Sequence, residues 1–189
     1  MNDIISEIFR LLQASKFEEI KNNYLLEMIS FDDISDENNG DTLLHYFFNN
    51  FDELLPVSTL NFLISCFFRI DHFNKENKTA VHILLEKHPS AIDYFNCLKG
   101  KGIPLFEKRG NCLSIFELII SSDNLNIFQP LIENFNLTYI REFYYEKSLA
   151  LALKYDSILI FDLLISESPF NLYTLFQEFL SNIHIPTSD

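Results

Sequence analysis

Two histidines and a cysteine are the residues of this sequence best suited to chemistry. His45 and His82 close the similar segments Thr-Leu-Leu-His and Thr-Ala-Val-His, and Cys112 follows further along the chain. Paired histidines are potential zinc ligands, and a cysteine beside a histidine is a potential nucleophile with its base. A zinc site needs further converging ligands, and a cysteine hydrolase needs an orienting acid and an oxyanion donor. Because the sequence shows no such pattern, we predict no catalytic residue, no metal site and no cofactor.

An enzyme is the rival class of function, with Cys112, Cys66 or a carboxylate acting in a cleft. The sequence contains no GxxxxGK[ST], GxGxxG or HExxH motif, so no phosphate-binding loop or metalloprotease helix is indicated. The acidic residues around Asp32 and Asp41 lack the alternating spacing and the central glycine of a calcium-binding loop. The residues therefore favour a protein without catalytic activity.

The composition predicts one packed helical domain. Of 189 residues, 48% are hydrophobic, and only four are glycine and six proline, which is too few for the tight turns of a β-sandwich. The apolar run at 115–120 contains Glu117 and is much shorter than a membrane span. The first residues lack the basic segment and cleavage site of a signal peptide. We expect no membrane insertion and either a cytoplasmic location or translocation into a host cell.

A short pattern of a small polar residue followed by an apolar helical segment occurs four times. The segment 41–47 is echoed 37 residues later at 78–84, and again at 111–116 and 147–152. A second apolar segment at helical spacing follows each copy, starting near Leu60, Ala91, Ile127 and Ile158. The repeated unit is therefore predicted to be helix, turn, helix and loop.

This unit resembles the ankyrin repeat, whose first helix begins with Thr-Pro-Leu-His. The motif stands here as Thr42 with His45 and as Thr79 with His82, while Cys112 takes the threonine position of the third copy. No copy keeps the proline, and a turn glycine is kept two residues before Thr42 and Cys112. The resemblance covers about residues 36–168, and it implies that the histidines bond the threonine hydroxyl and neighbouring backbone.

The predicted fold is an all-α, ankyrin-type helix-turn-helix repeat solenoid with divergent N- and C-terminal capping helices. We expect a single domain over 1–189. Its predicted parts are an N-terminal cap or degenerate repeat at 1–35, repeats at 36–74, 75–107, 108–143 and 144–168, and a C-terminal capping helix and tail at 169–189. Amphipathic stripes in the first 28 residues and over 170–183 predict the two caps.

The resemblance also implies a binding surface, because the turn before the threonine and the first helix line the concave face of an ankyrin array. Residues 61–110 hold eight Lys or Arg against five Asp or Glu in a chain of net charge −13. The turns at this face would thus form a basic strip for an acidic segment of a partner protein, with tyrosines as anchors. The predicted partner-binding residues are Lys75, Lys78, Lys87, Lys108, Arg109, Tyr144, Tyr145, Lys147 and Tyr155.

The predicted function is a non-catalytic protein–protein interaction scaffold that is monomeric when free. The acidic net charge argues against nucleic acid as a partner. Two roles stay open: a microbial effector that binds a host protein, and a small antagonist or chaperone of a partner in its own cytosol. Because Phe47 and Phe48 are consecutive, one of them is predicted to line a groove or a contact surface.

Overall fold

The computed structural model describes residues 2–14, 16–25, 35, 38–50, 56–66, 70–134 and 138–166. Regular secondary structure in these ranges is helical, with one isolated β-bridge between Ser35 and Thr42, so the all-α prediction is confirmed. The helices are α1 (Asn2–Gln13), α2 (Phe17–Ile20), a π-helical turn η1 (Lys21–Leu25), α3 (Leu43–Asn50), α4 (Val57–Ser65), α5 (Ala80–Lys87), α6 (Ile92–Lys99), α7 (Ile115–Ser121), α8 (Leu125–Asn134), α9 (Thr138–Tyr155) and α10 (Ile158–Ser166).

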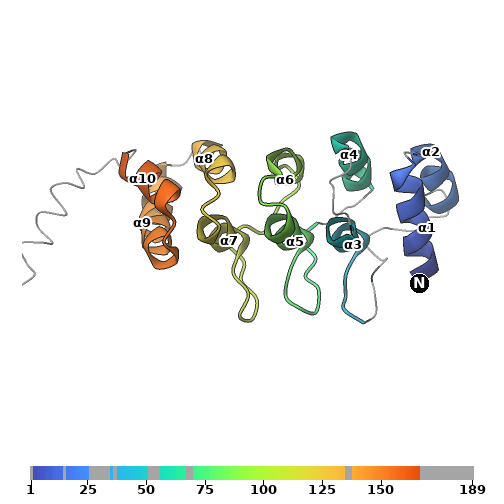
Figure 1. Cartoon of the computed structure of the whole chain (residues 1–189), viewed down its shortest axis with the longest axis horizontal. Coiled ribbons are helices and arrows are strands. Elements are labelled where there is room, and N and C mark those ends of the chain that lie inside the picture. The colour runs from blue at the N-terminus through green and yellow to red at the C-terminus, as the bar shows by residue number, and fades with distance from the viewer. Residues whose placement is uncertain are drawn as a thin grey trace, which may run out of the picture.

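The helices form two parallel rows along the longest axis of the molecule (Figure 1). Helices α3, α5, α7 and α9 are successive neighbours in one row, and α4, α6, α8 and α10 are successive neighbours in the other. The loops that precede α5 and α7, together with residues 38–42 before α3, project to the same side of the array (Figure 1). The predicted C-terminal helix at 170–183 lies outside the described residues.

The core runs through the array because every inner helix has neighbours on two sides. All six residues from Ala80 to Leu85 are buried in α5, which packs against both α3 and α7. Phe47 and Phe48 are both buried, at 1% and 0% exposure, so the prediction that one of them lines a surface is wrong. Consecutive side chains are buried together because the helix is covered on more than one face.

Helix α9 corrects the predicted start of the fourth repeat. It runs unbroken from Thr138 to Tyr155 and so crosses the predicted boundary between residues 143 and 144. The residues Tyr144, Tyr145 and Lys147 therefore belong to a helix and not to a projecting turn. The stretch contains no glycine or proline that would interrupt a helix.

The turns between paired helices are tied to the next pair along the array. Asp123 follows α7 with a positive φ of 49°, and its carboxylate accepts the backbone N–H groups of Leu159 and Ile160, each at 3.0 Å. It thereby caps the N-terminus of α10 from the preceding unit. Ser157 donates its hydroxyl to the carbonyl oxygen of Ile120 at 2.5 Å.

Within the described ranges, no helix has the length and apolar character needed to cross a membrane.

Candidate functional site

The first projecting loop is fixed to the second by His45. Its Nδ1 atom accepts the backbone N–H of Thr42 at 3.2 Å and lies 2.8 Å from the Thr42 hydroxyl. Its Nε2 atom lies 3.0 Å from the carbonyl oxygen of Lys78. Because Nδ1 accepts a hydrogen bond from the Thr42 N–H, it carries no hydrogen, so the ring hydrogen is on Nε2, which donates a hydrogen bond to that carbonyl; this arrangement defines a neutral ring. Burial lowers the pKa of His45 to about 4.

His82 repeats this arrangement one unit later. Its Nδ1 accepts the backbone N–H of Thr79 at 3.1 Å, and its Nε2 lies 3.0 Å from the carbonyl oxygen of Leu113. Burial lowers the pKa of His82. Both histidines therefore use Nδ1 within their own unit and Nε2 on a backbone carbonyl of the next unit, and neither ring offers a free nitrogen to a metal ion or a substrate. Among the described residues, no three His, Cys, Asp or Glu side chains gather closely enough to hold a metal ion.

The third unit places Ser114, and not Cys112, at the threonine position. Ser114 is the N-cap of α7, with its hydroxyl accepting the N–H of Glu117 and the Glu117 carboxylate accepting the N–H of Ser114. This reciprocal pair takes the place of Thr79 and His82. Gly110 has a positive φ of 56°, as Gly40 has one of 74°, but here two more residues separate the glycine from the cap. The sequence alignment on that glycine was therefore wrong by two residues.

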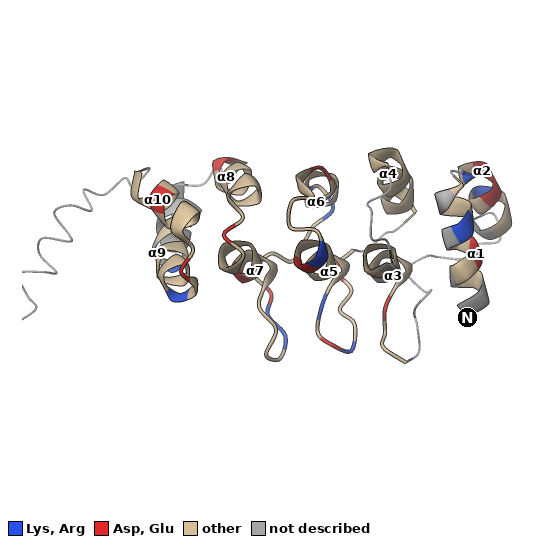
Figure 2. Ribbon diagram, in the orientation of Figure 1, with Lys and Arg blue, Asp and Glu red and all other residues tan. Residues whose placement is uncertain are grey.

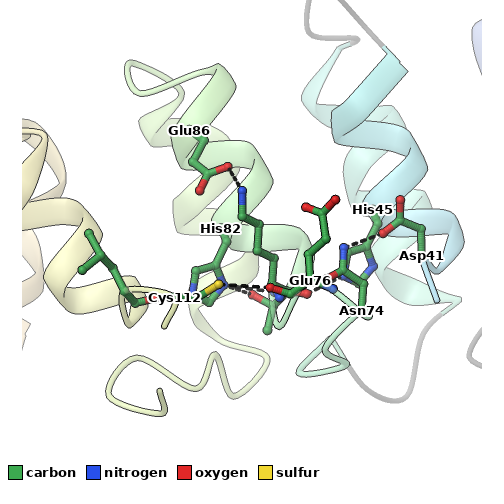
Figure 3. A network of polar contacts seen from close by, with 10 residues as sticks. Asp41, His45, Asn74, Glu76, His82, Glu86 and Cys112 are labelled. Carbon is green, nitrogen blue, oxygen red and sulfur yellow. Dashed lines mark hydrogen bonds and ion pairs between the residues drawn. The ribbon is translucent and has the colours of Figure 1, made fainter. Parts of the chain in front are cut away.

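Asn74 organises the loop between the first two units. Its side-chain oxygen accepts the backbone N–H groups of Glu76 and Lys78, both at 3.0 Å, and its amide donates to the buried Asp41 carboxylate at 2.6 Å. The Lys75 N–H also donates to the Asn39 carbonyl oxygen at 2.8 Å. Cys112 adds a third tie by donating its thiol to the Glu76 carbonyl oxygen at 3.0 Å. The loops thus present a connected surface rather than independent tips (Figure 3).

These loops and the first helices enclose a polar hollow of about 310 Å³. Lys78 is paired with Glu86 at 2.6 Å, and Lys87 donates to the carbonyl oxygen of Asn49 at 2.6 Å. Glu86 raises the pKa of Lys78, so this ammonium stays charged. In Figure 3 the Glu76 carboxylate projects to the side of the loops on which Glu86 lies. The hollow is lined by Asn39, Asp41, Asn49, Asn74, Glu76, Lys78, Ile83, Glu86 and Lys87.

The predicted basic strip is a strip of mixed charge. Arg109 pairs with Glu107 at 2.7 Å and lies over the ring of Phe73 at 3.9 Å. The ammonium of Lys108 lies 3.4 Å from the carboxylate of Glu117. The ammonium of Lys78 forms an ion pair with Glu86. Figure 2 shows both basic and acidic positions on the loops that precede α5 and α7. Lys78, Lys108 and Arg109 are therefore each paired with a carboxylate at this face, although the sequence between residues 61 and 110 has a surplus of cations. Each exposed ion pair contributes little to stability.

The predicted tyrosine anchors do not line this surface together. Tyr145 is 9% exposed and donates its hydroxyl to the carbonyl oxygen of Leu164, so it holds α9 against α10. Tyr155 is half-buried, with the ammonium of Lys154 over its ring at 4.7 Å. Lys147 is exposed on α9, and the side chain of Tyr144 lies outside the described residues.

The sequence interpretation did not identify Asn74, which helps to shape the hollow. Asp41 and Asn74 pair at 2.6 Å across 33 residues, and Glu86 stands one turn beyond His82. The spacing of the Thr-x-x-His motifs already placed Asp41 and Asn74 in neighbouring turns, so the sequence pattern could have predicted that the two residues lie close together.

Comparison of the chain with protein-family models, with curated proteins and with solved structures finds no match.

Proposed function

We propose that this chain is an ankyrin-type repeat scaffold that binds another protein through the inner surface formed by the projecting loops and the first helices. The observation that carries the proposal is the repeated tie from His45 to Lys78 and from His82 to Leu113. These ties fix successive loops at one spacing beside a polar hollow. A preorganised surface loses little conformational entropy on binding, which is the property that a binding scaffold needs.

The charges of the surface define the chemistry of the partner. An acidic segment of the partner binds here by replacing intramolecular carboxylates such as Glu86 beside Lys78 and Glu107 beside Arg109. Such an exchange contributes more to specificity and to association rate than to affinity, and it weakens as salt screens the charges. The polar hollow is the second source of specificity. A wrong partner would bury polar groups there without hydrogen-bond partners, and the lost hydration of those groups would weaken binding.

The contacts of Cys112 and His82 do not favour the alternative of a cysteine-dependent hydrolase. His82 uses both ring nitrogens on Thr79 and Leu113, and the Cys112 thiol donates to a backbone carbonyl. Burial raises the pKa of the Cys66 thiol, which disfavours the nucleophilic thiolate. The proposed scaffold therefore acts by occupying a surface of its partner.

Affinity capture with matched charge variants tests this function. The double variant Lys78→Glu with Lys87→Glu changes the hollow, and Lys101→Glu with Lys154→Glu makes the same change of net charge at exposed positions elsewhere. We expect the wild type and the second variant to retain the same protein at low salt, and the first variant to lose it. Retention by all three, with helicity unchanged by circular dichroism, would contradict the proposal.

The source of the retained protein separates the two roles. An effector retains a protein of a host cell, whereas an antagonist or chaperone retains a protein from the cytosol in which it is made. Capture from both kinds of extract, with the same two charge variants as controls, therefore assigns the role as well as the surface.

A further inference from the structure

The polar hollow carries charges that its own residues do not neutralise. Its charged lining consists of the carboxylates of Asp41, Glu76 and Glu86 and the ammonium groups of Lys78 and Lys87. Lys78 and Glu86 form an ion pair with each other. Among the described residues, none of the other three groups belongs to an ion pair. The hollow therefore offers a partner two negative charges, at Asp41 and Glu76, and one positive charge, at Lys87.

Asp41 is the buried member of this group. The residue is 6% exposed, and its two carboxylate oxygens accept the side-chain amides of Asn74 at 2.6 Å and Asn39 at 2.9 Å. Both donors are neutral, so they fix the position of the carboxylate without balancing its charge. Buried charges in proteins are normally paired with an opposite charge, and each carboxylate oxygen can accept one more hydrogen bond. Asp41 is therefore a preorganised acceptor for a cationic group.

Glu76 adds a second carboxylate on the neighbouring loop (Figure 3). Its backbone is held from two sides, because its N–H donates to the side-chain oxygen of Asn74 at 3.0 Å and its carbonyl oxygen accepts the thiol of Cys112 at 3.0 Å. Glu76 is exposed, and within the described part of the chain its carboxylate makes no hydrogen bond or ion pair. A fixed loop thus places an unpaired carboxylate at the hollow.

Lys87 supplies the positive charge from another element. It is the last residue of α5, and its ammonium donates to the carbonyl oxygen of Asn49 in α3 at 2.6 Å. An ammonium group has three N–H donors, so this bond leaves donors for a carboxylate of a partner. Because the bond reaches across to α3, it also holds the ammonium in place before a partner binds.

We propose that the hollow binds a basic side chain, lysine or arginine, from the same partner segment whose carboxylate binds Lys87. This inference rests on the proposed function and specifies the partner's charge pattern as an acidic residue close to a basic one. A volume of about 310 Å³ is near the lower limit of ligand pockets, about 300 Å³, and so admits one extended side chain. A basic group there balances Asp41 and Glu76, whereas a segment of carboxylates alone would be repelled by them.

Short peptides of defined charge test this proposal on the full chain at low salt, with amide chemical shifts in NMR as the readout. The first probe is a capped peptide with one glutamate and one lysine, made with zero, one or two glycines between them. In the second probe norleucine replaces the lysine, and in the third glutamine replaces the glutamate. We expect the best first probe to bind about fivefold more tightly than its norleucine form, with shifts at the amides of residues 74–78.

The outcomes separate this inference from the proposed function. Equal affinities of the first and second probes would overturn the basic side chain and leave the acidic segment standing. Equal affinities of the first and third probes would contradict the acidic segment, and the present proposal would fall with it. The absence of binding by the first probe at every spacing would also overturn the proposal.

Charge variants of the chain place the probe in the hollow. Glu76→Gln removes one charge, and we expect it to weaken the first probe about threefold without weakening the norleucine probe. Glu133→Gln makes the same change at an exposed position of α8 and should affect neither. Glu76→Lys should reverse the preference, so that a probe with a second glutamate in place of lysine binds more tightly than the first probe. No reversal, with circular dichroism unchanged, would show that the basic side chain does not enter the hollow.

Discussion

The Nε2 atom of His45 lies 3.0 Å from the backbone carbonyl oxygen of Lys78, and this contact joins one projecting loop to the next. His82 makes the same contact with Leu113. Both contacts are partly buried, so water replaces a lost donor only in part and its loss lowers the stability of the fold. The two histidines thus connect local motif geometry to the stability of the whole array.

Removal of either ring is expected to destabilise the protein. His82→Ala leaves the Leu113 carbonyl and the Thr79 N–H without their partner, and we expect it to lower the free energy of unfolding by about 1–3 kcal/mol. Urea denaturation followed by circular dichroism measures this loss. The control is His72→Ala, which removes a ring that is exposed. Equal stability of the two variants would show that the inter-loop bond contributes nothing.

The buried neutral histidines make stability depend on pH. Burial lowers the pKa of His45 from 6.5 to about 4, so the unfolded chain takes up a proton at a higher pH than the folded chain does. The free energy of unfolding therefore falls as the pH falls from 6.5 towards 4, by on the order of 3 kcal/mol from this group. Urea titrations at several pH values measure the slope. It should be shallower in His45→Gln, and an identical slope in that variant would contradict a neutral buried ring.

Asp123 is expected to hold the start of α10 in place. Its carboxylate accepts the N–H groups of Leu159 and Ile160 from the preceding unit. Asp123→Ala should cost about 1–2 kcal/mol and speed hydrogen exchange at those two amides. Asp123→Asn keeps one accepting oxygen and tolerates the positive φ, so it should lose less. If exchange at the two amides were unchanged in Asp123→Ala, the carboxylate would not be their acceptor.

The glycine before the first motif is expected to be intolerant of a side chain. Gly40 has a φ of 74°, and a Cβ there would lie 3.3 Å from the backbone nitrogen of Lys75. Gly40→Ala should therefore lower the free energy of unfolding by about 1–2 kcal/mol. Gly100 has a φ of −71° and open space around it, so Gly100→Ala serves as the matched control and should leave stability unchanged. Thermal unfolding of the two variants measures the change in stability. Equal losses of stability would contradict the close approach of Gly40 to the Lys75 backbone as the cause.

Periodicity predicted the helical units and the two complete Thr-x-x-His motifs, because hydrophobic spacing and cap chemistry are local properties. The register of the third unit was not predictable from Gly110 alone, since the choice between Cys112 and Ser114 depends on Glu117 folding back to close the cap. The long α9 was missed because helix continuation depends on the absence of a breaker and on packing against α7 and α10.

The charged surface shows a further limit of sequence patterns. The cations at Lys78, Lys108 and Arg109 were visible in the sequence, but their carboxylate partners come from positions 86, 117 and 107. A local excess of positive charge does not by itself give a basic face when the fold brings acidic residues beside it. The pairing depends on how the loops return over the helices.

Site-specific photocrosslinking tests most directly whether the inner surface binds a protein. A photoreactive amino acid at Glu76 lies in the hollow, and one at Glu133 lies exposed on α8 in the other row of helices. We predict that irradiation in cell extract attaches one defined protein to position 76, that Lys78→Glu with Lys87→Glu abolishes this product, and that position 133 gives none. Attachment of the same protein at position 133 but not at position 76 would contradict the account, as would the absence of any product at both positions.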